Sequence, residues 1–348
     1  MRAAWMALAV GLLVPGTAPA GAKVDEAMSR PALMLRQPQG AVLLAAATAG
    51  ARLVAVGERG VVVFSDDGGH AWRQADVPVS VTLTAIAFAD DKHGMAVGHG
   101  GVALSTTDGG ASWRRTLDGN QLAAIALASA RESGQAAAIK EAERLVAEGP
   151  DKPLLDIVLL DGHRALAVGA YGLAVTTEDG GRSWTSWSGR MDNPRGLHLY
   201  AARVRGGRIV IAGEQGLLLR STDGGTRFHR LSVPYSGSFF SIELPADGEI
   251  VVGGLRGNIW RSVDEGATWT KVETPAPVSV VGSTRAAGRT LFINQAGVVL
   301  DVSQGQARPA GHAPAGVLNG IVATGKGELI GLGPGGITTI DRSPAGGR

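Results

Sequence analysis

The chain contains no cysteine. Disulfide bonds, thiolate metal sites and a lipid-modified cysteine are therefore excluded, and the packed core must hold the fold together. Aromatic residues make up only 5% of the 348 residues, and the formal net charge of +2 is too small to predict nucleic-acid binding. The longest N-terminal apolar run, Ala3 to Val14, is shorter than the roughly 20 residues that a membrane-spanning helix needs. These absences favour a globular protein that depends on its core.

The first 20 residues have the features of a secretory signal. Arg2 precedes the apolar run, and the small-residue pattern Ala18-Pro19-Ala20 follows it. This order is typical of a cleaved signal peptide. We therefore expect residues 1–20 to be removed, the mature chain to begin near Gly21, and the protein to be exported to the periplasm or a lumen.

Glycine is abundant, with 52 residues, and it recurs in a fixed frame. The stretch Leu53 to Trp72, LVAVGERGVVVFSDDGGHAW, contains a G-x-x-G turn between two apolar runs, then an Asp-Gly-Gly turn and an aromatic residue. Such runs and turns predict short antiparallel strands. The frame returns at Gly98–Trp113, Gly169–Trp184, Gly213–Phe228 and Gly254–Trp269, and in weaker copies at Asn294–Gly297 and Gly333–Gly336.

The spacing of the copies predicts an all-β, seven-bladed β-propeller over residues 21–348. Copies begin about 40 residues apart, which is the period of four-stranded propeller blades. The last repeat supplies only three strands before the chain ends. We therefore expect a strand over about 31–37 to be its fourth, which would close the ring and remove the open sheet edges.

One interval, from Gly98 to Gly169, is longer and contains a segment of different composition. Residues of about 121–153 are rich in Ala, Leu, Glu, Lys and Arg, which favours a helical insertion between blades two and three. Gly134 is expected to divide it into two helices, with Ile139, Ala142 and Val146 on one apolar face of the second.

The repeated Asp and aromatic residues resemble the Asp box of sialidases and of many non-enzymatic propellers. A short carboxylate can accept hydrogen bonds from its own turn while the aromatic ring packs into the core. Catalysis or Ca²⁺ binding is the alternative, but a Ca²⁺ loop needs alternating acidic positions that are missing here. The residues assigned this structural role are Asp67, Trp72, Asp108, Trp113, Asp179, Trp184, Asp223, Phe228, Asp264 and Trp269.

The array of repeats looks like the photosystem II stability/assembly factor family of BNR-repeat propellers, and the likeness covers nearly the whole mature chain. Residues Glu141 to Asp156, EAERLVAEGPDKPLLD, further resemble the non-photosynthetic bacterial branch, whose members are often encoded beside RND-type transporters. The resemblance implies a monomeric, non-enzymatic scaffold without a cofactor or metal. Its partner would be a membrane protein or envelope complex, not a nucleic acid or a small-molecule substrate.

An enzyme remains the alternative, as a sialidase-like glycoside hydrolase or a carbohydrate-binding propeller. A sialidase needs a tyrosine nucleophile backed by an acid, and three arginines that converge on the substrate carboxylate. Tyr171, Tyr200 and Tyr235 are the tyrosines of this chain, and the Phe/Tyr-Arg-Ile-Pro signature is missing. The histidines lack metal-ligand spacing. A propeller with no recognisable site also remains open.

Strand direction predicts which face binds a partner. In an up-and-down blade the G-x-x-G turns lie on the same face as the connections between blades, and the Asp-box turns lie opposite. The turns carry varied residues inside a repeated glycine frame, which suits specific recognition. The predicted partner-binding residues are Arg59, His99, Tyr171, Gln215 and Arg256 on the turns, and Arg190, Arg195 and Tyr235 on the connections.

Overall fold

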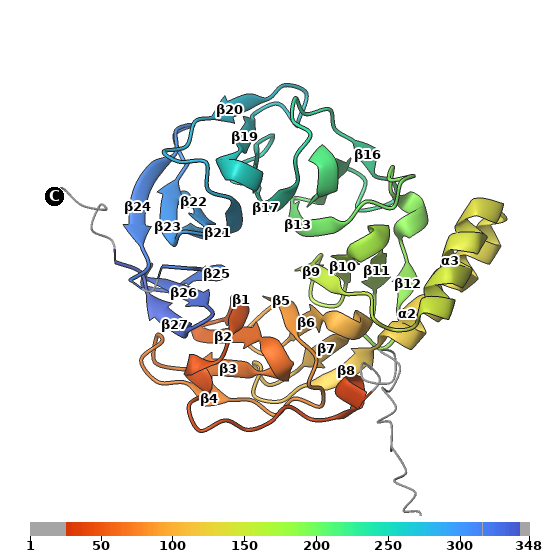
Figure 1. Ribbon diagram of the computed structural model, residues 1–348, viewed down its shortest axis with the longest axis horizontal. Coiled ribbons are helices and arrows are strands. Elements are labelled where there is room, and N and C mark those ends of the chain that lie inside the picture. The colour runs from red at the N-terminus through yellow and green to blue at the C-terminus, as the bar shows by residue number, and fades with distance from the viewer. Residues whose placement is uncertain (1–25, 315, 342–348) are drawn as a thin grey trace, which may run out of the picture.

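The computed structural model describes residues 26–314 and 316–341, so the expected signal peptide lies outside the described part. Seven antiparallel sheets stand around a central channel, and a pair of helices is inserted between the second and third (Figure 1). This architecture confirms the predicted seven-bladed propeller. In each sheet the strands follow chain order from the channel outward.

The blades are short sheets of two- to seven-residue strands. Blades one to three comprise β1 (Leu43–Ala49), β2 (Arg52–Gly57), β3 (Val62–Ser65) and β4 (Arg73–Gln74); β5 (Leu83–Phe88), β6 (Gly94–Gly98), β7 (Ala103–Thr106) and β8 (Arg114–Leu117); and β9 (Leu154–Leu159), β10 (Ala165–Gly169), β11 (Ala174–Thr177) and β12 (Thr185–Ser186). Blades four and five comprise β13 (Leu199–Arg205), β14 (Arg208–Gly213), β15 (Leu218–Ser221) and β16 (His229–Arg230); and β17 (Phe239–Glu243), β18 (Ile250–Gly254), β19 (Ile259–Ser262) and β20 (Thr270–Val272). Blades six and seven comprise β21 (Val280–Ala286), β22 (Arg289–Asn294), β23 (Val298–Asp301) and β24 (Arg308–His312); and β25 (Gly320–Ala323), β26 (Leu329–Gly333) and β27 (Gly336–Thr339).

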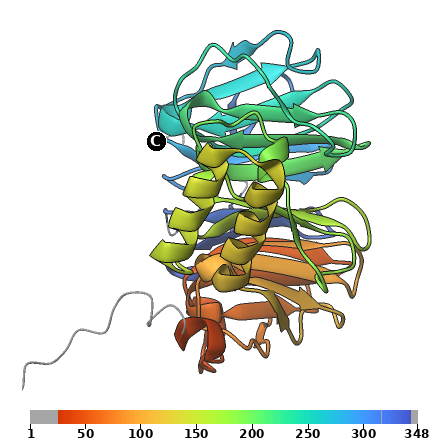
Figure 2. The same cartoon turned by 90° about the vertical axis from the view of Figure 1, so that its right-hand side faces the viewer.

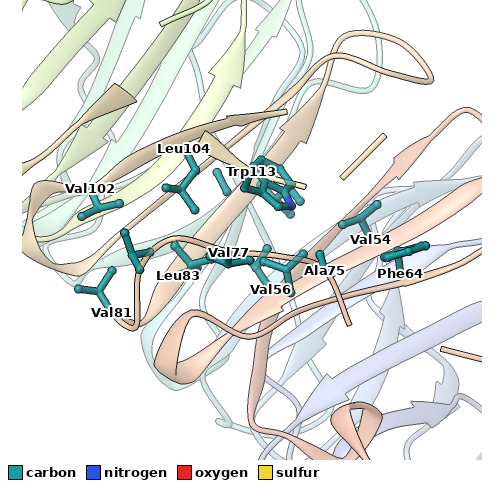
Figure 3. Close-up of a cluster of buried hydrophobic side chains, with 14 of the residues drawn as sticks. Val54, Val56, Phe64, Ala75, Val77, Val81, Leu83, Val102, Leu104 and Trp113 are labelled. Carbon is teal, nitrogen blue, oxygen red and sulfur yellow. The ribbon is translucent and has the colours of Figure 1, made fainter. Parts of the chain in front are cut away.

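The core lies between neighbouring blades rather than inside any one of them. Figure 3 shows the cluster between blades one and two, where Val54 and Val56 of β2 approach Leu104 of β7 and the ring of Trp113. Both faces of a middle strand are covered in this arrangement, which explains the continuous apolar runs in the repeat. The edge of the Phe88 ring meets Trp113 at a centroid distance of 6.2 Å.

The predicted closing strand over 31–37 is wrong. These residues form no strand, and the seventh sheet has three strands within the described chain. The segment instead runs along the outer edge of blade one, where the Ala32 amide donates to the Val77 carbonyl at 3.0 Å. The Leu35 amide donates to a side chain, that of Gln74, so no strand ladder forms.

The ring closes by side-chain packing instead. Leu43 of blade one and Leu332 of blade seven share one buried cluster. The Asn319 side-chain amide also donates to the Leu43 carbonyl at 3.0 Å, which joins the two blades without an exchanged strand.

The insertion folds as two helices that dock on the ring. Helix α2 (Gly119–Ser133) ends at Gly134, whose φ is +68°, and α3 (Ala136–Glu148) follows. The pair lies outside blades two and three (Figures 1 and 2), with Leu122 of α2 and Leu145 of α3 packed beside Trp184. Ala142 is buried as expected, whereas Val146 is 47% exposed, because Leu145 turns toward the core in its place. Neither helix has the length and apolar character that crossing a membrane requires.

Candidate partner-binding face

Five tight turns between the second and third strands of blades one to five define one face of the ring, here called the GxxG face. They are the 3-10 turns η2 (Glu58–Gly60), η3 (His99–Gly101), η4 (Ala170–Gly172), η6 (Glu214–Gly216) and η7 (Leu255–Gly257). Each touches a connection between blades: the Glu58 amide donates to the Val42 carbonyl, and the His99 amide to the Thr82 carbonyl. The turns and the connections therefore share a face, as strand direction requires.

The second residue of each of these turns has a left-handed backbone. Blade two uses Gly100 there, but the other four blades use Arg59, Tyr171, Gln215 and Arg256, with φ between 53° and 56°. A side chain in this region costs about 1–2 kcal/mol relative to a right-handed one. All four residues are exposed, so nothing in the core explains the cost.

Three other predicted residues lie at the same turns. His99 is exposed at the first position of its turn, and burial of part of its ring lowers its pKa. Arg195 donates to the Gln215 side chain, which joins the connection between blades three and four to η6. The Tyr235 hydroxyl donates to the Leu255 carbonyl at 3.1 Å, so this ring bridges to η7.

Arg190 does not join them, and its predicted place on the GxxG face is wrong. Its guanidinium lies 4.6 Å from the centre of the Trp187 ring and donates to the carbonyl of Gly225, in the Asp-box turn of blade four. The residue belongs to the short turn η5 (Ser188–Arg190), which packs against α2 at the outer edge. Arg190 lies early in the long connection that follows blade three. At this point the connection is still beside the Asp-box turn of blade four, and it reaches the GxxG face only after crossing the outer edge of the blade.

The Asp-box turns use their polar groups internally. In the box of blade one, the Ser65 hydroxyl donates to Asp67 Oδ1 at 2.7 Å, and the Ala71 amide donates to the same oxygen at 2.9 Å. The Trp72 indole donates to the Gly69 carbonyl. The hydroxyl-to-carboxylate bond recurs at Asp108, Asp179, Asp223 and Asp264. Within the described chain, no group of three potential ligands is arranged to hold a metal ion.

These bonds predict acid sensitivity. Hydrogen bonds led by the Ser183 and Thr268 side chains lower the pKa values of Asp179 and Asp264 from 3.8 to about 2. Because the folded pKa is the lower one, the stabilisation is complete above pH 4 and is lost as the pH falls toward 2. Urea unfolding of Asp264→Asn should show lower stability at pH 7 and a smaller loss between pH 4 and 2 than the unmodified protein. Asp247→Asn is the control: the side chain is 96% exposed and pairs only with the part-exposed Arg205, a kind of pair that contributes little stability, so the profile should stay unchanged.

A ring of side chains at the mouth of the channel was not predicted from the sequence. Six inner strands carry a register shift close to their first residue. Such a bulge can redirect a side chain. The residues at these shifts all line the channel, and they are Leu44, Thr84, Leu155, Tyr200, Phe240 and Val281. Their common signal is a position 13 or 14 residues before the first residue of the turn, which is Gly in blades one to five and Asn294 in blade six; it is visible once the strands are paired.

Solved structures share the fold at low sequence identity. The structure described as "YCF48 bound to D1 peptide" aligns with a TM-score of 0.63 and 17% identity, covering 90% of this chain and 100% of that one. YCF48 from Cyanidioschyzon merolae aligns with a TM-score of 0.61 and 16% identity over 90% of this chain and 98% of its own. The WD40 propeller domain of Doa1 aligns with a TM-score of 0.64 and 11% identity, covering 91% of this chain and 96% of that one. At these identities the likeness shows the fold alone.

Sequence comparison goes further. The photosystem II assembly lipoprotein Ycf48 of Synechococcus sp. (strain CC9902) is 31% identical over 93 residues, which are 27% of this chain and 26% of that protein. The chain thus aligns with about a quarter of this relative's length. Residues 64–147 and 135–307, more than half of the chain, match the family described as "Photosynthesis system II assembly factor YCF48". The chain belongs to this family of assembly-factor propellers.

Proposed function

We propose that this protein is an exported, non-enzymatic scaffold that binds a protein partner through its GxxG face and assists the assembly or stability of a membrane-protein complex. The main support is the left-handed backbone conformation of four exposed residues, Arg59, Tyr171, Gln215 and Arg256. All five turns need this conformation, and glycine would adopt it without strain, as in blade two, so a side chain retained there at a cost is typically functional. Here it repeats at one position of four blades, on one face.

Three exposed apolar side chains lie on the GxxG face, against Val263, which is 61% exposed, on the Asp-box turn of blade five. Tyr171 is 47% exposed on η4, Leu255 is 39% exposed on η7, and Val317 is 51% exposed on the connection into blade seven. Exposed apolar groups among polar ones are typical of protein-binding surfaces. The opposite face is formed by Asp-box turns whose carboxylates are already bonded within the turn.

The kind of partner follows from family membership. One relative is named as a photosystem II assembly lipoprotein, and a solved YCF48 structure is that of the protein bound to D1 peptide. For this chain we propose an envelope complex of a non-photosynthetic bacterium, with an RND-type transporter as the candidate, reached after cleavage of residues 1–20. A mature N-terminus near Gly21 in the periplasmic fraction is the expected result of N-terminal sequencing. Recovery of the uncleaved chain in the membrane pellet would contradict export by a cleaved signal.

A double charge reversal tests the binding face. Arg59→Glu with Arg256→Glu should abolish capture of the partner from solubilised envelope membranes, because both guanidinium groups are exposed on the face and pair with no described acid. The matched control is Arg182→Glu with Arg227→Glu, two exposed arginines of the Asp-box turns. Both double variants should keep the melting temperature of the unmodified protein. Equal loss of capture in both, or no loss in the first, would refute the assignment of the face.

A further inference from the structure

The outer edge of blade seven is open. Its last strand, β27, is the third of the sheet, and no described strand pairs with its outer side (Figure 1). Alternate residues of an antiparallel strand bond to opposite neighbours. The Ile340 amide bonds to the Leu329 carbonyl of β26, so the amides and carbonyls of Ile337 and Thr339 point outward. None of these four groups has a backbone partner among the described residues.

β27 also lacks the residues that protect the other outer strands. An exposed strand edge invites pairing with another chain, and natural proteins guard it with charged side chains or a cover. The outer strands of five blades carry a basic residue, and these are Arg73, Arg114, His229, Lys271 and Arg308. β12 of blade three is uncharged, but helix α2 packs against it. β27 has the uncharged sequence Gly-Ile-Thr-Thr, whose β-branched residues favour strand pairing.

The other blades show what an added strand must supply. In blades one, three and four, one apolar residue beside the outer strand makes two contacts. Its amide donates to the first outward carbonyl of the third strand, and its side chain packs in one cluster with the box aromatic of the next blade. These residues are Ala75, Trp187 and Leu231, whose amides donate to Val62, Ala174 and Leu218 at 2.8–2.9 Å. Their aromatic neighbours are Trp113, Phe228 and Trp269.

Both contacts are missing where blade seven meets blade one. The Ile337 carbonyl has the position of the Leu218 carbonyl in blade four, but it accepts no bond from the described residues. Trp72, the box aromatic of blade one, is half-buried, and no described outer strand of blade seven covers it. Trp72 and Ile337 pack against the same buried clusters, so the carbonyl and the ring belong to one site. This site fits an apolar residue of an extended chain.

We infer that the outer edge of blade seven binds an extended segment of the partner protein as its fourth strand. The segment pairs antiparallel with β27, and one of its apolar side chains covers Trp72. The edge is continuous with the GxxG face, because β27 begins at the turn after Gly333, beside the exposed Val317. The inference rests on the proposed function, because it adds a second contact with the same partner.

Two other occupants fit the edge less well. A second copy of the chain would pair through a strand of four residues, which falls short of the roughly 800 Å² per partner that a stable dimer buries. The C-terminal residues 342–348 follow Asp341, whose amide and carbonyl both bond to His312, so the described chain ends against blade six. Residues 342–348 also include Pro344 and two glycines, which disfavour a strand.

A synthetic strand tests the inference. The probe is a fluorescein-labelled peptide of residues 228–233, FHRLSV, which is the outer strand of blade four with its Leu231. Fluorescence anisotropy should show saturable binding to the purified protein. Replacing the leucine of the peptide by aspartate should weaken binding at least tenfold, because no apolar side chain then covers Trp72. Thr339→Pro, which removes an outward amide but no bond to β26, should weaken it about tenfold. Thr339→Val keeps the amide and should bind as the unmodified protein does.

Methylation of the peptide backbone provides a second test if Thr339→Pro fails to fold. In blade four the Leu231 amide faces the third strand, and so does the alternate amide of His229. A peptide methylated at these two amides should not bind. The matched peptide, methylated at the amides of Arg230 and Ser232 on the opposite edge, should bind as the unmodified peptide does. Equal effects of the two methylations would show that the peptide does not pair as a strand.

Other results would also overturn the inference. They are no saturable binding, binding that appears only after removal of residues 342–348, or a dimer of the unmodified protein that dissociates in Thr339→Pro. The result separates from that of the face. If the arginine double variant loses partner capture while the peptide does not bind, the proposed function stands and the edge site does not. If the peptide binds at the edge but capture is unaffected by the double variant, the assigned face is wrong.

Discussion

Replacing Phe228 by alanine is expected to lower the free energy of unfolding by about 3–5 kcal/mol, the usual cost of removing a buried aromatic side chain. Phe228 is only 1% exposed and lies in the core between blades three and four. Its ring meets that of Trp187 at 6.2 Å, and its amide donates to the Arg190 carbonyl. The substitution therefore leaves a cavity in the core between blades three and four. Urea denaturation at pH 7 would measure the loss.

Trp269 provides the comparison, because it holds the same position in blade five but is only half-buried. Trp269→Ala should cost less than Phe228→Ala, although tryptophan is the larger side chain. If Trp269→Ala were the more damaging variant, interblade burial would not be the source of the stability. Loss of partner capture with unchanged stability in Phe228→Ala would assign the ring to binding instead.

The repeat made the fold predictable, because each copy carries its own strands and turns. The residues from Gly57 to Trp72 mark the positions of the turns within one blade, and the spacing between copies of this frame gives the number of blades. The insertion was equally predictable from the sequence, because its composition favours helix and the two helices end at Gly134 and Gly149. In each case the signal is local, within one blade or one helix.

Contacts between distant segments were not predictable in this way. A strand was expected over residues 31–37 because blade seven lacked a fourth one, not because of their composition. Whether they pair with blade seven depends on the path from Met28, whose carbonyl accepts a hydrogen bond from Arg115 of blade two. Arg190 was misplaced because its connection crosses the blade edge before reaching the GxxG face. The ring at the channel mouth depends on bulges, which arise from strand pairing and have no composition of their own.

Gly297→Ala is expected to be strongly destabilising. Gly297 has a φ of +77°, and a β-carbon there would lie 1.7 Å from the Gly316 carbonyl oxygen. The turn would have to move away from the connection into blade seven, which it also holds through the bond from the Ala313 amide to the Gly297 carbonyl. We expect a loss of about 2–5 kcal/mol, from backbone strain of about 1–2 and overpacking of about 1–3.

Gly288→Ala separates the two contributions, because Gly288 lies at the other end of β22 with nearly the same φ, +75°, and has nothing within 4 Å of the added carbon. It should show the strain alone, about 1–2 kcal/mol. The difference between the two variants then measures how tightly blade six is pressed against the connection that closes the ring. Equal losses in Gly297→Ala and Gly288→Ala would mean that this contact yields at no cost, and that ring closure depends instead on the contacts between blades seven and one.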